Sequence, residues 1–243
     1  MSTAPGTRVQ SRSRQIGAIK RVAARLLAEK GVAGLSLREV AREMGLVSSA
    51  LYRYFATRDE LLTALIFDAY NQLGANVERA EARVDRSDLR GRWVATCAAT
   101  RRWAKAHPNE YALLYGTPVP GYHAPDLTIA AATRVAAVMG AILNDDRRSR
   151  PPLESPLPAP SVSFLEVERL KAVMPDVAPE QYIRALMAWS QVFGFINFEL
   201  FGHFVGSVRD DQRMFATVVE ELADFLDLAP STAPVLNPRR GTG

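Results

Sequence analysis

Apolar residues recur every three or four positions through most of the chain, which is the spacing of one face of an α-helix. No segment shows the alternation of apolar and polar residues that is typical of a β-strand. The sequence therefore predicts an all-α protein. The expected helices cover roughly residues 13–30, 36–44, 47–55, 58–83, 88–106, 108–115, 127–143, 164–173, 179–205 and 210–228.

The stretch 36–62 contains two short predicted helices and the start of a third. Ser36 with Glu39, and Thr57 with Glu60, have the spacing of capping boxes that begin a helix. Gly45 can take the left-handed conformation that ends one. Two short helices around a glycine turn form a helix-turn-helix, which places its second helix in the major groove of DNA. The inner faces are expected to be Leu37, Val40, Ala41 and Met44 on the first helix and Val47, Leu51 and Phe55 on the second.

The outer face of the second helix carries hydrogen-bonding groups with few acidic neighbours. We expect base-edge contacts from Ser48, Ser49 and Tyr54, with Arg53 beside them and Ala50 suited to a thymine methyl group. Phosphate contacts are expected from Tyr52, Arg58 and Ser36, the last with the N–H groups of its helix. Arg38 could reach a base or a phosphate. Alternatively, Tyr52 and Tyr54 pack against the core and Arg53 is only solvated.

The segment Leu51-Tyr52-Arg53-Tyr54-Phe55, followed by Arg58 and Leu61-Leu62, resembles the TetR family of transcriptional repressors. The resemblance is specific over roughly residues 12–70. It implies a homodimer that binds a palindromic operator in double-stranded DNA and is released by a small molecule. Three positions depart from the family pattern. Ala50 can offer only an apolar contact. Val47 stands where a capping Ser or Thr is common, so the second helix could begin later with Ser48 as its cap, and Arg58 replaces the commoner Lys.

The distribution of charge supports nucleic-acid binding. The 243 residues carry a formal net charge of +4, but residues 1–60 alone hold 11 Lys and Arg against 5 Asp and Glu. The remaining residues hold 19 against 21, so the basic excess lies in the amino-terminal quarter. A basic module on a nearly neutral body is typical of a protein that binds a polyanion. A basic tail that only improves solubility is the alternative.

Composition and helix lengths predict four regions. Residues 1–11 read as a disordered arm, whose arginines could reach DNA, and 12–57 as the helix-turn-helix domain. Residues 58–228 form a helical domain for effector binding and dimerisation, and 229–243 a disordered tail. Within the body, the Pro- and charge-rich stretch 145–161 predicts a mobile loop.

The body is expected to supply both a dimer interface and a ligand site. The predicted helix 179–205 is apolar around nearly its whole circumference, and such a helix must be buried on all sides. We therefore expect a four-helix dimer interface that includes Leu186, Leu200, Phe204, Val218, Leu222 and Phe225. Aromatic residues with a few polar groups line many small-molecule sites. The candidates for an apolar or aromatic effector are Trp103, Tyr111, Tyr115, Trp189, Phe193, Asn197 and Phe198, each of which could instead be core.

Other classes of protein find less support in the sequence. Cys97 is the only cysteine, which fits a reducing cytoplasm, and no signal peptide or membrane span is expected. No metal or phosphate motif appears, so we expect no cofactor and no enzymatic activity. Glu199 and His203 are four residues apart and could bind a metal, although a structural role is more common. The alternatives are an all-helical small-molecule-binding protein or enzyme with an accessory DNA-binding head, and a helical adaptor or membrane-surface protein.

Overall fold

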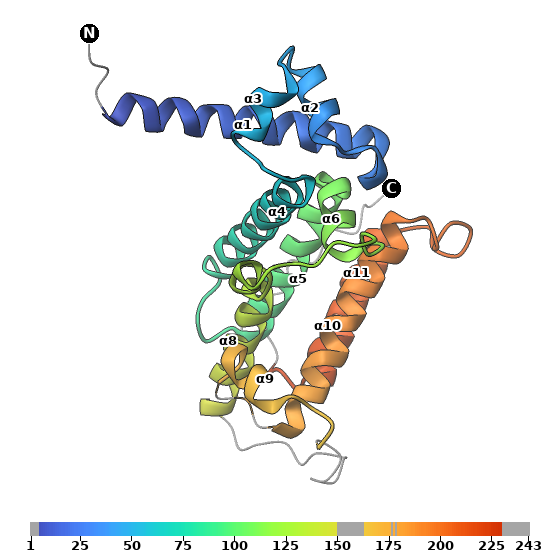
Figure 1. The fold of residues 1–243 in the computed structure, drawn as a ribbon. Helices are drawn as coiled ribbons and strands as arrows, with labels where there is room; N and C mark the ends of the chain where they lie inside the picture. The colour runs from blue at the N-terminus through green and yellow to red at the C-terminus, as the bar shows by residue number, and fades with distance from the viewer. Residues whose placement is uncertain (1–4, 150–162, 176, 178, 230–243) are drawn as a thin grey trace. The chain divides into compact units, whose positions relative to one another are not determined.

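The computed structural model describes residues 5–149, 163–175, 177 and 179–229. Over these residues the secondary structure is helical, with turns and no strand, so the predicted fold class is confirmed (Figure 1). The chain divides into two compact units. The first, called the head unit, comprises Met1–Gln72 and His107–Ala132, and the second, called the body unit, comprises Leu73–Ala106 and Thr133–Gly243.

The head unit is built around three helices at the amino terminus. Helix α1 (Pro5–Lys30) leads through the short 3-10 helix η1 (Val32–Gly34) to α2 (Leu37–Glu43) and α3 (Ser48–Tyr52). The first part of α4 (Arg58–Glu81), α6 (Pro108–Tyr115), η2 (Asp126–Thr128) and α7 (Ile129–Ala132) complete the unit. Its apolar core confirms the predicted inner faces of these helices except at Val47. The core consists of Ile19, Ala23, Leu26, Leu35, Leu37, Val40, Ala41, Leu51, Phe55, Leu61, Leu62, Leu65 and Ile66.

Helix α1 begins earlier than the sequence predicted. The expected disordered arm over 1–11 is wrong for residues 5–11, which are helical, while residues 1–4 lie outside the described part. Pro5 occupies the first helical position, where its fixed φ suits the helix and its missing N–H costs nothing. No further proline follows up to Lys30, so nothing stops the helix.

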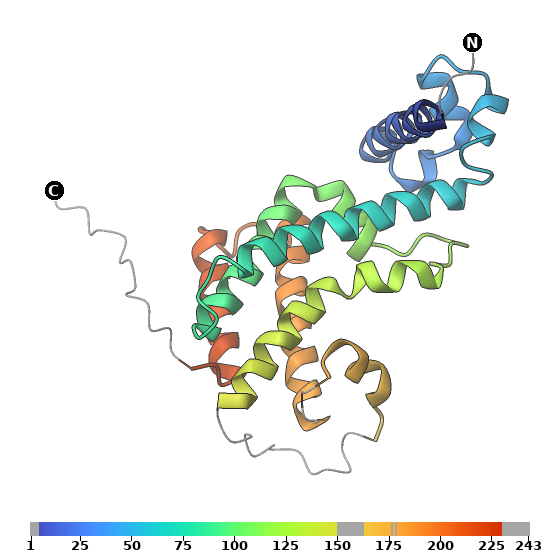
Figure 2. The same ribbon diagram turned by 90° about the vertical axis from the view of Figure 1, so that its left-hand side faces the viewer.

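The body unit contains the rest of α4 and five further helices. These are α5 (Leu89–Ala106), α8 (Arg134–Ser149), α9 (Val167–Val173), α10 (Pro179–Leu200) and α11 (Asp211–Phe225). Helix α5 contacts α8, α10 and α11 and forms the centre of the unit (Figure 2). The indole Nε1 of Trp93 donates to the carbonyl oxygen of Val219 over 2.9 Å and ties α5 to α11.

A buried charge network joins α4, α5 and α8 within the body unit. Arg92 has no exposed side-chain surface, and its Nε donates to Glu81 over 2.5 Å while Nη1 donates to Asp145 over 2.8 Å. Arg86 binds the same two carboxylates at 2.9 and 2.5 Å. Two cations are therefore matched by two anions, which offsets much of the cost of taking these charges out of water.

Several predicted boundaries differ from those in the structure. Asp88 caps α5, because its Oδ1 accepts the N–H of Gly91, and the neighbouring Ser87 binds Asp85. The single helix expected over 127–143 is three segments, η2, α7 and α8. Residues 145–149 of the expected loop are helical, and 150–162 lie outside the described part. Helix α10 ends at Leu200, after which Gly202 and Gly206 adopt φ of 77° and 82°.

Gly74 in α4 has a packing role that the sequence did not reveal. A Cβ placed on Gly74 would lie 2.8 Å from both Cβ and Cδ of Arg134. The Arg134 side chain passes over this position and binds the Glu78 carboxylate at 2.7 and 2.5 Å. The glycine therefore provides the space for an ion pair between α4 and α8.

In the described part of the chain, no single helix has both the length and the apolar content needed to cross a membrane. One bent pair, Asp126–Ala132 with Arg134–Asp146, meets those two criteria jointly.

Candidate nucleic-acid interface

The two short helices α2 and α3 are fixed by local hydrogen bonds that the sequence largely anticipated. The Ser36 hydroxyl accepts the Glu39 N–H over 3.1 Å and begins α2. The Glu39 carboxylate does not complete the capping box, because Lys30 and Arg42 bind it and lower its pKa. Gly45 has a φ of 64°, and the Leu46 N–H bonds back to the Ala41 carbonyl over 2.9 Å. This Schellman-type ending sets the direction in which α3 begins.

Helix α3 is held on the core by apolar side chains on one side and presents polar side chains to solvent on the other. Leu51 has no exposed surface and Phe55 only 7%, so these two side chains hold the helix on the core. Tyr52 is 46% exposed, and Ser49 and Arg53 are exposed as well. The packing alternative for Tyr52 is thereby excluded. Ser48 and Ala50 are half-buried at the start of the helix, where they border the same surface.

Val47 and Ser48 do not play the parts expected of them. Val47 was predicted on the inner face, but its side chain is 72% exposed and it occupies the N-cap position with no side-chain hydrogen bond. The alternative cap, Ser48, is the first helical residue. The exposed Val47 is explained by the turn after Gly45, which brings Leu46 rather than Val47 toward the core side, where Leu46 is half-buried.

Tyr54 is not a freely exposed base reader in this structure. It lies beyond the end of α3, and its ring packs partly against the head core. The Arg12 guanidinium carbon lies 5.4 Å from the centre of that ring, and Arg12 Nη2 is 3.5 Å from the carbonyl oxygen of Arg53. Arg12 therefore contacts the carboxyl end of α3 from α1. The signal was present in the sequence, since Arg12 lies four residues before Ile16 and continues the α1 stripe.

Arg58 has partners within the protein. Its Nε donates to the Leu35 carbonyl over 2.9 Å, and its Nη2 donates to the Val32 carbonyl over 2.8 Å. These bonds fix the start of α4 to the segment between α1 and α2. The phosphate contact predicted for Arg58 is not supported by this geometry, because two of its donor atoms are directed at the backbone.

The remaining predicted residues lie on the exposed side of α2. Arg38 is exposed in the first turn, and no ion pair or hydrogen bond engages it among the described residues. Ser36 is exposed at the same end. The structure thus gathers Ser36, Arg38, Ser48, Ser49, Ala50, Tyr52 and Arg53 on α2 and α3 and turns Arg58 and most of Tyr54 inward.

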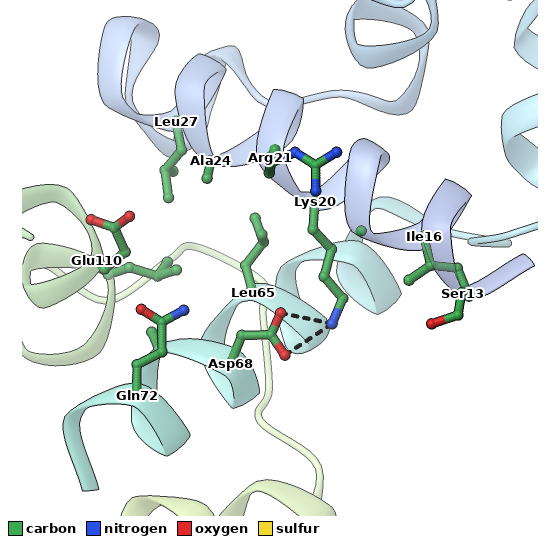
Figure 3. Close-up of a pocket in the computed structure, with 13 residues that line it drawn as sticks. Ser13, Ile16, Lys20, Arg21, Ala24, Leu27, Leu65, Asp68, Gln72 and Glu110 are labelled. Carbon is green, nitrogen blue, oxygen red and sulfur yellow. Dashed lines mark hydrogen bonds and ion pairs between the residues drawn. The ribbon is translucent and has the colours of Figure 1, made fainter. Parts of the chain in front are cut away.

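The head unit also contains a pocket of about 410 Å³ between α1, α4 and α6 (Figure 3). Its walls include Ile16, Leu65 and Leu113. The Lys20 ammonium binds both oxygens of the Asp68 carboxylate at 2.7 and 2.9 Å across the pocket. This ion pair therefore joins α1 to α4 at the pocket.

The seven residues predicted for an effector site are divided between the two units. Tyr111 and Tyr115 belong to the head unit, where their rings lie 5.1 Å apart and burial raises the pKa of both phenols. In the body unit, Trp189 stacks on Phe193 at 4.6 Å and Trp103 is buried. None of these seven residues lines any of four pockets in the described part of the chain, so which of them contact an effector stays a prediction.

Two other body features bear on function. Helix α10 is not buried on all sides within one chain, since Leu186, Met187 and Phe198 are 38%, 52% and 51% exposed. The possible metal pair is also engaged elsewhere. Glu199 is bound by Arg101 and Lys105, His203 packs on the Phe198 ring at 4.9 Å, and the described residues contain no group of three metal-binding side chains.

A helix-turn-helix whose second helix shows a polar, cation-bordered surface, attached to a larger helical unit, defines a DNA-binding transcriptional regulator. Residues 19–65 match the model for bacterial regulatory proteins of the tetR family, and residues 93–222 match the tetracyclin repressor-like carboxyl-terminal domain. The protein belongs to the TetR family, a family of regulators rather than of enzymes.

Relatives of similar length support this assignment. HTH-type transcriptional regulators of Mycobacterium tuberculosis and Mycobacterium bovis are 38% identical over 212 residues, which cover 85% of this chain and 89% of each relative. A solved structure described as a regulatory protein has 32% identity and a TM-score of 0.72, covering 92% of this chain and 100% of that one. The TetR family regulator PfmR of Thermus thermophilus shares the fold, at 19% identity, a TM-score of 0.53 and coverage of 84% and 96%.

Proposed function

We propose that this regulator is a homodimeric repressor that binds a palindromic operator through α2 and α3. The observation that carries the proposal is the exposed face of α3, with Tyr52 46% exposed above the fully buried Leu51. Ser48, Ser49 and Ala50 are assigned to base edges, together with the exposed part of Tyr54. Ser36, Arg38, Tyr52 and Arg53 are assigned to phosphates or adjacent bases. A protein that acts on chromosomal DNA in this way works in the cytoplasm.

A dimer is favoured by the apolar surface on the last two helices. Leu186 and Met187 of α10 and Met214 of α11 are 38%, 52% and 41% exposed, and Phe201 just beyond α10 is 52% exposed. Such a surface is uncommon on a monomer and typical of an interface. The predicted residues Leu200, Phe204, Val218, Leu222 and Phe225 are only half-buried in one chain, which leaves surface for a partner. Two heads on a twofold axis read a palindrome.

The effector is proposed to bind in the body unit and to offer hydrogen-bonding groups as well as an apolar or aromatic part. Thr96 Oγ1, Asn144 Oδ1, Asn197 Oδ1 and the Gln181 amide are buried and have no hydrogen-bond partner among the described residues. A buried polar atom without a partner costs about 1–3 kcal/mol, which a matching ligand could recover. Binding would favour one body conformation and thereby change the affinity for DNA.

The test begins with genomic fragments recovered by the purified protein, with and without candidate metabolites. Binding of a recovered fragment is then measured by fluorescence anisotropy for Tyr52→Ala and Arg38→Ala, both of which should weaken it. Arg83→Ala is the matched control, because Arg83 is an exposed arginine of the body unit. Failure to bind any duplex at low ionic strength would refute the assignment of this surface.

The dimer is tested separately by light scattering after size-exclusion chromatography. Leu186→Lys should give monomers, whereas Phe164→Lys, at a body-unit side chain that is 71% exposed outside α10 and α11, should not. A wild-type protein that is monomeric at micromolar concentration would exclude the proposed interface. For the effector, Asn197→Ala should reduce the response to the active metabolite without changing DNA binding in its absence. A promoter reporter distinguishes repression from activation.

A further inference from the structure

A groove on the body unit between α5 and α11 has features of a ligand site apart from the buried polar groups described above. It consists of two adjoining cavities of about 280 and 720 Å³, which share Arg101, Arg102 and Gln212 as lining residues. The smaller cavity is mostly apolar, and the larger one is mostly charged. The groove therefore changes from apolar to cationic along its length.

The apolar part is firmly built. Val94 and Ala98 of α5 face Phe215, Ala216 and Val219 of α11. Phe215 and Val219 are only 4% and 2% exposed, and the bond from Trp93 to the Val219 carbonyl fixes the two helices against each other. From Val94 to Arg102 is two turns of α5, or roughly 12 Å. This floor has the length and the chemistry to hold an alkyl chain.

The cationic part holds two arginines whose charge is not neutralised locally. Arg101 and Lys105 share the Glu199 carboxylate, and Arg101 also lies 5.2 Å over the Phe215 ring. By contrast, Arg102 and Arg209 are exposed, and in the described part of the chain no carboxylate forms an ion pair with either. An arginine fork that is still available suits a carboxylate, which it can bind with two parallel hydrogen bonds.

Three of the described acidic residues line the groove, and their partners determine how much negative charge each end presents to a ligand. At the apolar end, Glu220 is bound by Arg90 over 2.7 Å, so its charge is offset. At the cationic end, the Asp210 carboxylate accepts the Arg213 N–H over 2.9 Å as the cap of α11. Asp211 also lines this end, and among the described residues no hydrogen bond or ion pair engages its carboxylate. It opposes an anionic ligand, and its removal should strengthen binding.

We infer that this groove binds an anionic amphiphile, a straight-chain carboxylate whose tail lies on Val94, Ala98, Phe215 and Ala216 and whose head meets Arg102 and Arg209. The groove and the surface proposed for dimerisation take different residues of α11. Gln212 and Ala216 of the groove and Met214 and Val218 of the dimer surface are two apart, and such residues point to nearly opposite sides of a helix, at 100° per residue. Leu222 of the dimer surface, seven residues after Phe215, points to nearly the same side as Phe215, so the two surfaces adjoin at that point.

The experiment uses the full-length protein and decanoate below its micellar concentration, with binding measured by isothermal titration calorimetry. Decanoate should bind, and decanol, which has the same chain without the charge, should bind at least tenfold more weakly. Arg102→Ala and Arg209→Ala should each weaken decanoate binding about tenfold, Asp211→Asn should strengthen it, and Arg83→Ala should leave it unchanged. Ala216→Leu, which fills the apolar floor without changing charge, should also weaken it.

Three results would overturn the inference: no decanoate binding, equal binding of decanol, or loss of binding in Asn197→Ala but not in Arg102→Ala. The last would place the fatty anion at the buried polar groups instead. The affinity for DNA is also measured on these variants in the absence of decanoate. The groove variants should bind DNA as tightly as the wild type does, so a failure of this inference can be distinguished from a failure of the proposed function.

Discussion

Two roles can be considered for Arg58, and they predict different effects when its side chain is removed. As a phosphate contact, it would affect DNA binding and its salt dependence. As the structure has it, the guanidinium donates to the carbonyls of Leu35 and Val32 and holds the start of α4 on the α1–α2 connection. We therefore predict that Arg58→Ala mainly lowers the stability of the folded protein.

The size of the effect follows from the two hydrogen bonds. Hydrogen bonds with a charged partner contribute about 1.5–3 kcal/mol each. The Arg58 side chain is 33% exposed, so water can reach the freed carbonyls and the loss should be smaller, about 2 kcal/mol in total. For a chain of this length that corresponds to a decrease in Tm of roughly 4–8 °C, if the protein unfolds in one step. Arg58→Lys, which keeps one donor group, should lose about half as much.

The assay pairs thermal unfolding by circular dichroism with DNA binding by anisotropy at several salt concentrations. Arg38→Ala is the control, since Arg38 is exposed and has no partner among the described residues. For Arg38→Ala, Tm should be unchanged, and the slope of log K against log salt should fall by about 0.9 if one phosphate contact is lost. Arg58→Ala should show the opposite pattern. An unchanged Tm together with a reduced slope would refute the reasoning and restore the phosphate contact.

Three further predictions test the body unit. Gly74→Ala should destabilise the protein despite the better helix propensity of alanine, because its Cβ would lie 2.8 Å from both Cβ and Cδ of Arg134. Gly74→Ala with Arg134→Gly, which removes both of these atoms, should lose less stability in a thermal unfolding experiment than the sum of the two single changes. Arg92→Met, which removes the fully buried cation that binds both Glu81 and Asp145, should cost about 3–5 kcal/mol in chemical unfolding. Arg86→Ala, at a side chain that is 66% exposed, should cost about 1 kcal/mol or less. Burial by itself would raise the pKa of Glu199, but hydrogen bonds from Arg101 and Lys105 outweigh it and hold that pKa below its ordinary value of 4.5. The stability that this shift gives is present above pH 4.5 and is lost as the pH falls through the lower pKa of the folded state. Glu199→Gln should therefore flatten the acid limb of a plot of unfolding free energy against pH.

Sequence alone determined the helical fold class and the existence of the helix-turn-helix. Its determinants are local: the cap at Ser36, the left-handed Gly45 and the buried Leu51 each act within a few residues of their own position. Hydrophobic periodicity identified the core faces for the same reason, because a helix buries the face on which its apolar residues recur. The exposed polar face of α3 follows directly from that choice of buried face.

Tertiary structure decided what the long side chains do. In the sequence alone, nothing distinguishes Arg12, Arg58 and Arg134 from ordinary surface cations. In the structure, Arg12 and Arg134 reach partners 41 and 56 residues away along the chain. Arg58 reaches partners 23 and 26 residues away. The pocket and groove residues are likewise brought together only by the packing of α1 on α4 and of α5 on α11. Periodicity shows which side of a helix is buried, but the neighbour that covers it, and the atom that an arginine finally meets, depend on contacts that no local pattern encodes.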